Sequence, residues 1–537
     1  MGSPLSSRWW LGYVRGSALG VQKGIVAEPL NKARQSETSR NFDEGGIVSE
    51  KDPNTSDPQE ESGPRERKTV SRREFLKIAG VAGATVGLGA GLGGVLAACG
   101  GATTTTTAPT TATTAGATTT TAAAGSTTTV SAAATAGRDL KLGLVEPKTG
   151  SLAQFAIADD WWVAWAQAAT ADGVVCADGK NHKIQILRAD SQSDANRASQ
   201  VAADLILNSN VDMILSSGSP DTVVPVADQC ETNATPGLFN FSPWQATFYR
   251  STTPATGYKW IWGYCLGSEQ TIADFSDMFD KIPNNKIVGM LFANDADAQA
   301  WMAPNAAPAV FKAKGYKLIV PSYYTEGAED FTTQINAYKK AGCDILCGTN
   351  NPPDVVNFFK QAVQQGFKPK LASSGKGLLF PQVPEALLTS AYNFIGELSW
   401  SPAWPFTDSL TGKTCQEMAN DFETKAGMQW QQTIAEYAKF EWAIDLYKRA
   451  TNPEDKATVT AAVPTTKLNT CAGPIDFTQA IDPNGNHPVV NNVKPVYAGG
   501  QWVKGTGKYK LDFVECSNAA APGTQVAATP LPMVYTA

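Results

Sequence analysis

LKLGLVEPKTGSL (residues 140–152) is the stretch of sequence that decides the fold. It begins with a short apolar run, which predicts a buried β-strand, and it contains a turn at Gly150-Ser151. A long helical pattern follows, which carries Trp161, Trp162 and Trp165. A buried strand that leads into a helix is the repeating unit of a parallel α/β sheet.

The same alternation of strand and helix continues along the chain. Strand patterns next occupy 183–188, 211–216 and 237–241, with helical patterns at 195–208 and 221–230. A second series follows, with strands at 286–292, 317–320, 344–347 and 370–373 and helices at 271–279, 300–313, 331–341 and 354–365. A single hydrophobic core stops growing at about 250–300 residues, so two lobes suit a chain of 537 residues. We therefore predict an α/β protein with two doubly wound parallel-sheet lobes.

The charge pattern argues against a nucleic-acid partner. The whole chain has a formal net charge of −6. Residues 1–98 carry 13 Lys+Arg and 11 Asp+Glu, which leaves a net charge of −8 for the rest. A negative surface repels phosphate backbones, and the sequence after residue 98 has no basic stripe interleaved with aromatic residues.

Histidine is scarce, which argues against a catalytic or metal-binding protein. The sequence contains only His182 and His487, and neither lies in an HExxH motif or in an i, i+4 pair of metal ligands. The GxSxG elbow of many hydrolases is also missing from the sequence. We therefore expect no enzymatic activity, no cofactor and no bound metal.

Nine cysteines are present, and one of them, Cys99, is assigned below to lipidation. The other eight are either paired, as an oxidising compartment allows, or buried free thiols. They are Cys176, Cys230, Cys265, Cys343, Cys347, Cys415, Cys471 and Cys516.

The N-terminal part has the features of a leader. Residues 1–70 are polar and charged without helical or strand periodicity, which predicts a disordered extension. The paired Arg72 and Arg73 follow, then an uncharged run at 78–98 that ends in Leu-Ala-Ala before Cys99. The segment resembles a twin-arginine export signal (71–98) joined to a lipoprotein box. The arginines serve as the address, the apolar run enters the membrane, and the small residues admit a peptidase.

A retained transmembrane helix is the alternative explanation of the uncharged run. The run is rich in glycine and only weakly apolar, which favours a lipid anchor on Cys99 at the outer face of the cytoplasmic membrane, in the cell envelope. The Thr/Ala-rich segment 99–137 has almost no large apolar side chain to bury, so we expect a tether there. Because the signal lies far from Met1, we also expect translation to start at a non-Met codon such as that of Val48 or Val70.

Several motifs in the rest of the chain, taken in order, resemble those of a known family. The first-lobe motifs are LGLVEPKTGSL (142–152), DSQSD (190–194) and PVADQ (225–229). Later motifs are NDAD (294–297), DFT (330–332) and GPIDF (473–477). Together they resemble the branched-chain amino-acid binding proteins, the type I periplasmic binding proteins of ABC importers. The resemblance extends from Asp139 to the C-terminus.

The resemblance implies two lobes joined by a hinge of three crossings, which close on a ligand. By that analogy lobe one comprises 138–262 plus 398–488, and lobe two comprises 263–397 plus 489–537. It also implies a monomer that delivers a small organic solute, an amino acid or a carboxylate-like compound, to the permease subunits of an ABC importer. A ligand-sensing component of a signalling system is the alternative, because the same two-lobed body serves receptors.

The candidate ligand site follows from the fold class. In doubly wound sheets, ligands bind beyond the carboxyl ends of the strands, where helix N-termini offer free amides. The loops 218–222 and 242–245 follow two such strands, and the second matches the second ligand loop of the family. Plain N-capping by Ser219 and core packing of Trp244 are the alternatives. These loops, together with residues that follow the second-lobe strands, give ten predicted ligand-binding residues: Ser219, Pro220, Asp221, Thr222, Ser242, Trp244, Gln245, Asp297, Asn350 and Lys376. Simple turn chemistry is the alternative for Asp297, Asn350 and Lys376. The family resemblance implies that Phe155 faces the same cleft.

One stretch departs from the family pattern. Family members that bind amino acids usually offer an acidic residue of lobe two to the ammonium of the ligand. The corresponding stretch here is Ser-Ser-Gly-Lys (373–376), which has no carboxylate. We therefore expect a carboxylic acid or another polar compound without an α-ammonium.

Overall fold

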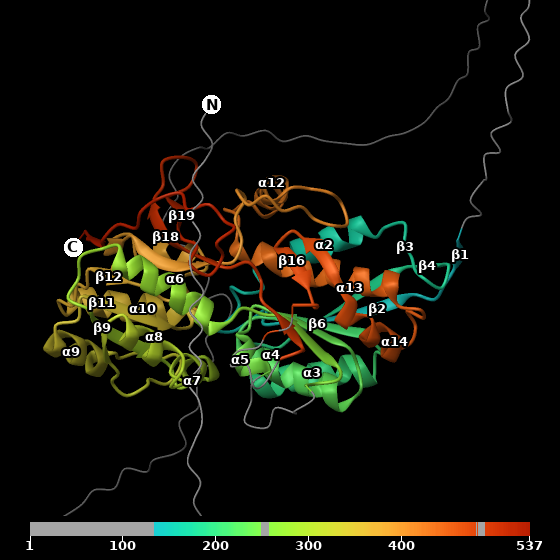
Figure 1. The fold of residues 1–537 in the computed structure, drawn as a ribbon, viewed down its shortest axis with the longest axis horizontal. Coiled ribbons are helices and arrows are strands. Elements are labelled where there is room, and N and C mark those ends of the chain that lie inside the picture. Colours follow the sequence, from blue (N-terminus) through green and yellow to red (C-terminus); the bar gives the residue numbers. More distant parts are fainter. Residues whose placement is uncertain (1–133, 249–256, 480, 482–488, 537) are drawn as a thin grey trace, which may run out of the picture. The chain divides into compact units, whose positions relative to one another are not determined.

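A six-stranded parallel sheet forms the first lobe, with the strand order β17, β8, β7, β6, β2, β5 (Figure 1). The structure is a computed structural model that describes residues 134–248, 257–479, 481 and 489–536, and the structural statements below refer to these residues. The strands are β2 (Leu140–Glu146), β5 (Ile184–Asp190), β6 (Met213–Ser217), β7 (Gly237–Asn240), β8 (Ile261–Tyr264) and β17 (Asn492–Val493).

Strand β2 lies inside this sheet, between β5 and β6, so both of its edges are paired. Leu142 and Leu144 pack into one hydrophobic cluster and Val145 packs into another. Burial on both faces explains why this strand carries apolar side chains at even and odd positions alike, Leu142 and Leu144 on one face and Val145 on the other.

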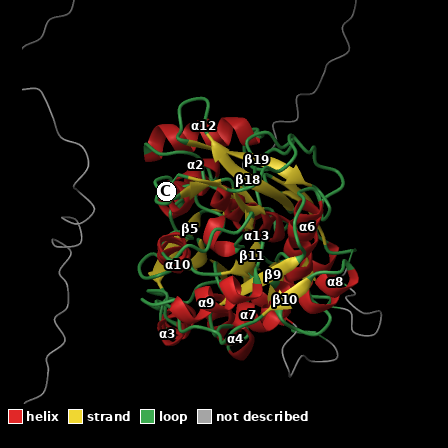
Figure 2. Cartoon of the chain, turned by 90° about the vertical axis from the view of Figure 1, so that its left-hand side faces the viewer, coloured by secondary structure: helices red, strands yellow, loops and turns green. Residues whose placement is uncertain are grey.

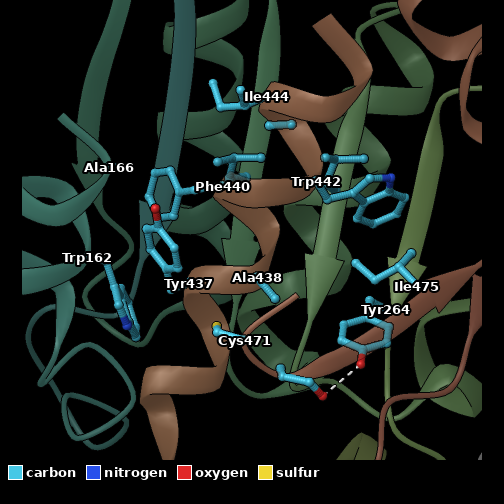
Figure 3. Packing of buried hydrophobic residues seen from close by; sticks show 14 of the residues in the cluster. Trp162, Ala166, Tyr264, Tyr437, Ala438, Phe440, Trp442, Ile444, Cys471 and Ile475 are labelled. Atoms are coloured by element: carbon cyan, nitrogen blue, oxygen red, sulfur yellow. Dashed lines mark hydrogen bonds between the residues drawn. The ribbon is translucent and has the colours of Figure 1, made fainter. Parts of the chain in front are cut away.

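Helices cover both faces of the first sheet. In Figure 1, α3 and α4 lie on one side of it and α2 and α13 on the other. Their bounds are α2 (Asp159–Ala169), α3 (Ala195–Leu207), α4 (Pro220–Thr232) and α13 (Ala438–Arg449). Figure 3 shows Phe440, Trp442 and Ile444 of α13 in the hydrophobic cluster that also contains Leu142 and Leu144 of β2. The predicted doubly wound arrangement is confirmed for this lobe.

The second lobe contains a four-stranded parallel sheet with the order β10, β9, β11, β12. Its strands are β9 (Ile287–Phe292), β10 (Lys317–Ile319), β11 (Ile345–Thr349) and β12 (Leu371–Ala372). Its helices are α6 (Ser268–Asp280), α7 (Ala296–Trp301), α8 (Ala307–Ala313), α9 (Thr332–Ala341) and α10 (Pro352–Gln364). The second predicted parallel sheet is therefore also confirmed.

An antiparallel sheet of three strands, in the order β14, β18, β19, extends the second lobe and was not predicted. The strands are β14 (Phe394–Leu398), β18 (Ala498–Lys504) and β19 (Leu511–Ser517). An isolated parallel bridge between Ser373 and Ile395 links β14 to the end of β12. In Figure 2, β18 and β19 are seen above β9, β10 and β11.

The chain passes between the two lobes at three places. The first crossing joins β8 to α6, the second follows β14 at Ser399, and the third joins β17 to β18. Since β17 pairs with β8, residues 492–493 belong to the first sheet, and the third crossing lies later than the expected boundary at residue 488.

The remaining elements are short strands, short helices and one longer helix. The strands are β1 (Thr135–Ala136), β3 (Val174–Val175), β4 (Lys180–His182), β13 (Ala391–Tyr392), β15 (Lys467–Thr470), β16 (Gly473–Asp476) and β20 (Val534–Tyr535). The α-helices are α5 (Trp244–Phe248), α11 (Gln382–Glu385), α12 (Cys415–Ala426) and α14 (Lys456–Ala461), and the 3-10 helices are η1 (Lys376–Leu378), η2 (Gln432–Tyr437) and η3 (Val463–Thr465). Strand β1 pairs with β4, so the last residues of the expected tether 99–137 form part of the first lobe.

Of the two alternatives for the eight cysteines after Cys99, the structure shows buried free thiols. Within the described ranges, no helix combines the length and the apolar character that a membrane span requires. The predictions for residues 1–70, for the signal with Arg72 and Arg73, for Cys99 and for His487 concern positions outside the described residues.

Candidate ligand-binding site

A cavity lies between the two lobes, at the carboxyl ends of their strands, and contains about 350 Å³ of space that no atom fills. The first lobe contributes Phe155, Gly218, Ser219, Pro220, Phe241 and Pro243. The second lobe contributes Asp297, Trp301, Thr349, Lys376, Leu379 and Glu397. Leu266 and Tyr497 come from two of the crossings. Charged groups, helix termini and aromatic rings thus converge on one space, as ligand pockets require.

The first-lobe wall is formed by the turn from β6 into α4. Gly218 adopts a φ of 120°, a conformation that disfavours any residue with a Cβ. Pro220 occupies the first turn of α4, where its missing N–H is not needed. The Ser219 hydroxyl donates a hydrogen bond of 2.9 Å to Asp221. The turn therefore presents Ser219 and the positive end of a 13-residue helix to the cavity.

Lys376 is the cation of the second-lobe wall. Its ammonium lies 2.7 Å from Asp297 and 3.1 Å from Asp295, and all three side chains are buried. Burial alone would lower the pKa of Lys376, but the carboxylates of Asp297, Asp295 and Asp221 raise it well above its ordinary value. Burial raises the pKa of Asp297 to about 6, although Lys376 opposes that effect. Lys376 is therefore charged at neutral pH.

Glu397 is a lining residue that the sequence analysis missed. It is the fourth residue of the buried strand β14, and it accepts hydrogen bonds of 2.8 Å from the hydroxyls of Thr271 and Tyr497. Burial raises the pKa of Glu397 to about 7. A glutamate inside the apolar strand FIGEL was a usable sequence signal, because such a group is costly unless it serves a site.

The carboxylates of Asp297 and Glu397 correct one expectation about the ligand. The stretch 373–376 has no carboxylate, but the second lobe supplies two from other segments of the chain. The absence of an acidic residue in that stretch is thus no reason to exclude an ammonium group.

Phe155 lines the cavity and also holds the lobes together. It is buried, and its ring meets Phe380 of the second lobe edge to face, with centroids 5.2 Å apart. Leu152 and Phe155 belong to a hydrophobic cluster whose other members are mainly second-lobe residues. The segment after β2 therefore packs its apolar side chains into the opposite lobe.

Five predicted ligand residues line the cavity, namely Phe155, Ser219, Pro220, Asp297 and Lys376. The other six lie beside it and bond to the protein. Thr222 donates to the Ser219 carbonyl at 3.2 Å, and Asp221 accepts from the Ser219 hydroxyl. Asn350 donates to the Leu291 carbonyl at 3.0 Å, which ties the end of β11 to β9.

The second predicted loop is also engaged within the protein. Ser242 shares a hydrogen bond of 2.8 Å with Thr247. Trp244 and Gln245 both donate to the carboxylate of Glu269 on α6, and Trp244 does so at 3.1 Å. Phe241 and Pro243 of the same loop line the cavity in their place.

A buried ionic cluster lies directly behind the first-lobe wall. The ammonium of Lys439 lies 2.5 Å from Glu146, 2.6 Å from the Ser217 hydroxyl and 3.4 Å from Glu436. The Nζ of Lys439 also lies 4.8 Å from the centroid of the Trp162 ring. Ser217 immediately precedes Gly218, so the cluster fixes the strand end from which the cavity wall begins.

Burial raises the pKa of Glu146 to about 7 and raises the pKa of Glu436 well above its ordinary value. Lys439 opposes both shifts. Two carboxyl groups therefore face a single ammonium, and burial favours the protonated form of each.

The sequence matches a model of the periplasmic binding protein family over residues 139–497, and a model of twin-arginine translocation signals over residues 69–89. The second match identifies a signal for export across the cytoplasmic membrane.

Solved structures share the fold. The branched-chain amino acid transporter substrate-binding protein LivJ from Streptococcus pneumoniae, in complex with isoleucine, is 15% identical with a TM-score of 0.55, over 70% of this chain and 99% of that chain. The leucine-binding protein LivK from Thermotoga maritima is 18% identical with a TM-score of 0.54, over 70% and 97%. An ABC-transporter solute-binding protein from Rhodopseudomonas palustris, in complex with 3,4-dihydroxybenzoic acid, is 19% identical with a TM-score of 0.54, over 71% and 96%.

The family match covers more than half of the chain, and the two-lobed α/β fold with its cavity between the lobes agrees with it. The chain therefore belongs to the periplasmic binding protein family, whose members bind solutes rather than transform them.

Proposed function

We propose that the chain is a lipid-anchored solute-binding protein outside the cytoplasmic membrane that delivers a small organic solute to an ABC importer by hinge closure. The observation that carries the proposal is the cavity, because both lobes and two of the crossings contribute to its walls. A solute held there contacts both lobes at once, which favours the closed form over the open one. The permease subunits of the importer then recognise that closed form.

The charges in the cavity favour an amino acid or a carboxylate-like compound. The helix α4 terminus, Ser219 and Lys376 suit a carboxylate. Asp297 and Glu397 suit an ammonium or a hydroxyl, and Phe155, Phe241 and Trp301 suit an apolar body. The bound isoleucine and dihydroxybenzoic acid of the solved structures belong to these two chemical classes.

A thermal-shift screen of the purified protein tests the binding function. The panel contains aliphatic and aromatic amino acids, aromatic and aliphatic carboxylates, amides and sugars. A ligand at about 100 times its Kd adds about 2.7 kcal/mol of stability, which shifts Tm by a few degrees. A saturable shift with amino acids or carboxylates supports the proposal. A shift with sugars alone contradicts the proposed solute class.

Lipid anchoring at Cys99 is tested separately. The matched export signal precedes this cysteine, and the small residues before it suit a lipoprotein peptidase. In cells fed a radiolabelled fatty acid, the wild-type protein takes up label and stays with the membrane fraction. C99A takes up no label and is found in the soluble fraction. Label in C99A argues against this anchor.

A further inference from the structure

A second, smaller pocket lies at the hinge and contains about 270 Å³ of space that no atom fills, open solvent included; we call it the hinge pocket. Its walls are Asn240, Phe241, Tyr264, Leu266, Ser399, Ala435, Ala472, Pro495 and Tyr497. Leu266, Ser399 and Pro495 come from the first, second and third crossings respectively. A group in this pocket therefore lies beside all three crossings.

The hinge pocket adjoins the ligand cavity. Phe241, Leu266 and Tyr497 line both spaces and form the boundary between them. A solute whose charged end lies near Lys376 and Ser219 reaches the hinge pocket by passing this boundary.

One polar atom of the hinge pocket has no partner. The Oδ1 of Asn240 makes no hydrogen bond with the described residues, although the side chain is only 3% exposed. The Asn240 amide nitrogen donates to the Glu436 carbonyl at 3.3 Å, which leaves Oδ1 as the free end of the side chain. A buried acceptor without a donor is unfavourable and is usually satisfied by water or by a ligand.

The other polar groups of the hinge pocket are already engaged. The Tyr264 hydroxyl donates to the Ala472 carbonyl at 3.0 Å, and Figure 3 shows Tyr264 with this bond. The Tyr497 hydroxyl donates to Glu397, and Ser399 donates to Gln432. The pocket thus offers largely apolar walls and one acceptor, Asn240 Oδ1, that has no partner among the described residues.

We propose that the hinge pocket is a subsite that receives the far end of the solute, an apolar group that ends in a hydroxyl donating to Asn240. The inference rests on the proposed function and narrows its solute class to hydroxyl-terminated carboxylates or amino acids. It also makes the hydroxyl a specificity determinant, because a site with an unpaired acceptor discriminates against the analogue that lacks the donor.

The test is isothermal titration of the full-length protein with matched pairs of compounds that differ by one hydroxyl. The pairs are phenylalanine and tyrosine, benzoate and 4-hydroxybenzoate, and pentanoate and 5-hydroxypentanoate. In at least one pair, the hydroxylated member is expected to bind about 3- to 10-fold more tightly, the effect of one net hydrogen bond.

Two variants assign that difference to the pocket. N240L removes the acceptor, and A472V narrows the space. In both, the ratio of the two affinities is expected to fall to about 1, while the compound without the hydroxyl keeps its affinity in N240L. The control is A166V, a change at an equally buried alanine of α2 that lines neither cavity, and it is expected to keep the wild-type ratio.

Equal affinities within every pair that binds would overturn the subsite and leave the proposed function standing. So would a crystal structure with a bound hydroxylated compound in which a water alone occupies the hinge pocket. If no member of any pair binds and the wider screen also finds no solute, the proposed function itself fails, and the subsite fails with it.

Discussion

The ammonium of Lys376 in the second lobe lies 3.5 Å from the hydroxyl oxygen of Ser219 in the first lobe. A charged side chain that is held by Asp295 and Asp297 of its own lobe thus touches the helix terminus of the other lobe. This contact crosses the cavity where a solute is proposed to bind, so the lysine is central to both stability and recognition.

Replacing Lys376 by methionine is expected to destabilise the protein by about 3–5 kcal/mol, because it leaves Asp295 and Asp297 buried without their cation. The double variant K376M/D297N is expected to recover part of this loss, since it also removes one of the two charges. Urea denaturation of the wild type, K376M, D297N and the double variant measures the free energy of unfolding of each. Equal stability of K376M and the wild type would show that the pair contributes nothing.

The raised pKa of Glu397 predicts that the free energy of unfolding falls as the pH rises. Its pKa is raised to about 7 in the folded protein, whereas an unfolded glutamate titrates at about 4.3. Between these values the folded state holds a proton that the unfolded state has released, so the folded state loses stability as pH rises from about 5 to about 7. The contribution is at most about 4 kcal/mol.

The variant E397Q isolates this contribution. Glutamine keeps the shape, and the hydroxyls of Thr271 and Tyr497 can rotate to suit it. Urea denaturation between pH 5 and pH 8 is expected to give a shallower decline for E397Q than for the wild type. Parallel curves would mean that Glu397 is ionised throughout this range.

In the buried ionic cluster behind the first-lobe wall, we expect substitutions of Glu436 and of Lys439 to differ in their effect on stability. E436Q is expected to change stability by about 1 kcal/mol or less at neutral pH, because burial raises the pKa of Glu436 and so favours its neutral form, which glutamine resembles. K439M is expected to cost about 3–5 kcal/mol, because it leaves Glu146 without its partner. Denaturation at pH 7 compares the two variants. A larger loss in E436Q than in K439M would contradict this expectation.

Replacing Gly218 by alanine is expected to weaken binding of the solute, and this effect can be distinguished from a general loss of stability. A Cβ at this position finds ordinary space, with its nearest neighbour 3.6 Å away, so the cost of G218A arises from the φ of 120°. We expect about 1–2 kcal/mol of destabilisation and at least about tenfold weaker binding of the solute found in the screen. The control is G315A, which also has a positive φ but lies away from the cavity. Comparable losses of affinity in both variants would remove the special role of Gly218.

The sequence predicted the parts of the site that depend on local pattern. The apolar run of β2 and the turn before Pro220 place Ser219 at the end of a buried strand, as expected. Asp297 and Lys376 also lie at strand ends of the second lobe, and both line the cavity.

The parts that were missed depend on pairings between distant segments. Trp244 was expected to face the ligand, but its indole donates to Glu269, a residue of another helix that no local pattern connects to it. Tyr497 lines both cavities because β18 returns to pair with β14, an antiparallel pairing that alternation of strands and helices does not encode.

The short pairing of β1 with β4 has a mechanical consequence. The chain enters the first lobe at Thr135, and the carbonyl of Arg138 bonds to the ring of His182 at 2.8 Å, while the Arg138 guanidinium pairs with Asp212. A pull along the chain from its N-terminal side is therefore borne by the first lobe alone. If Cys99 is held at a membrane, the anchor is connected to the first lobe, and the second lobe is the one that is free to move.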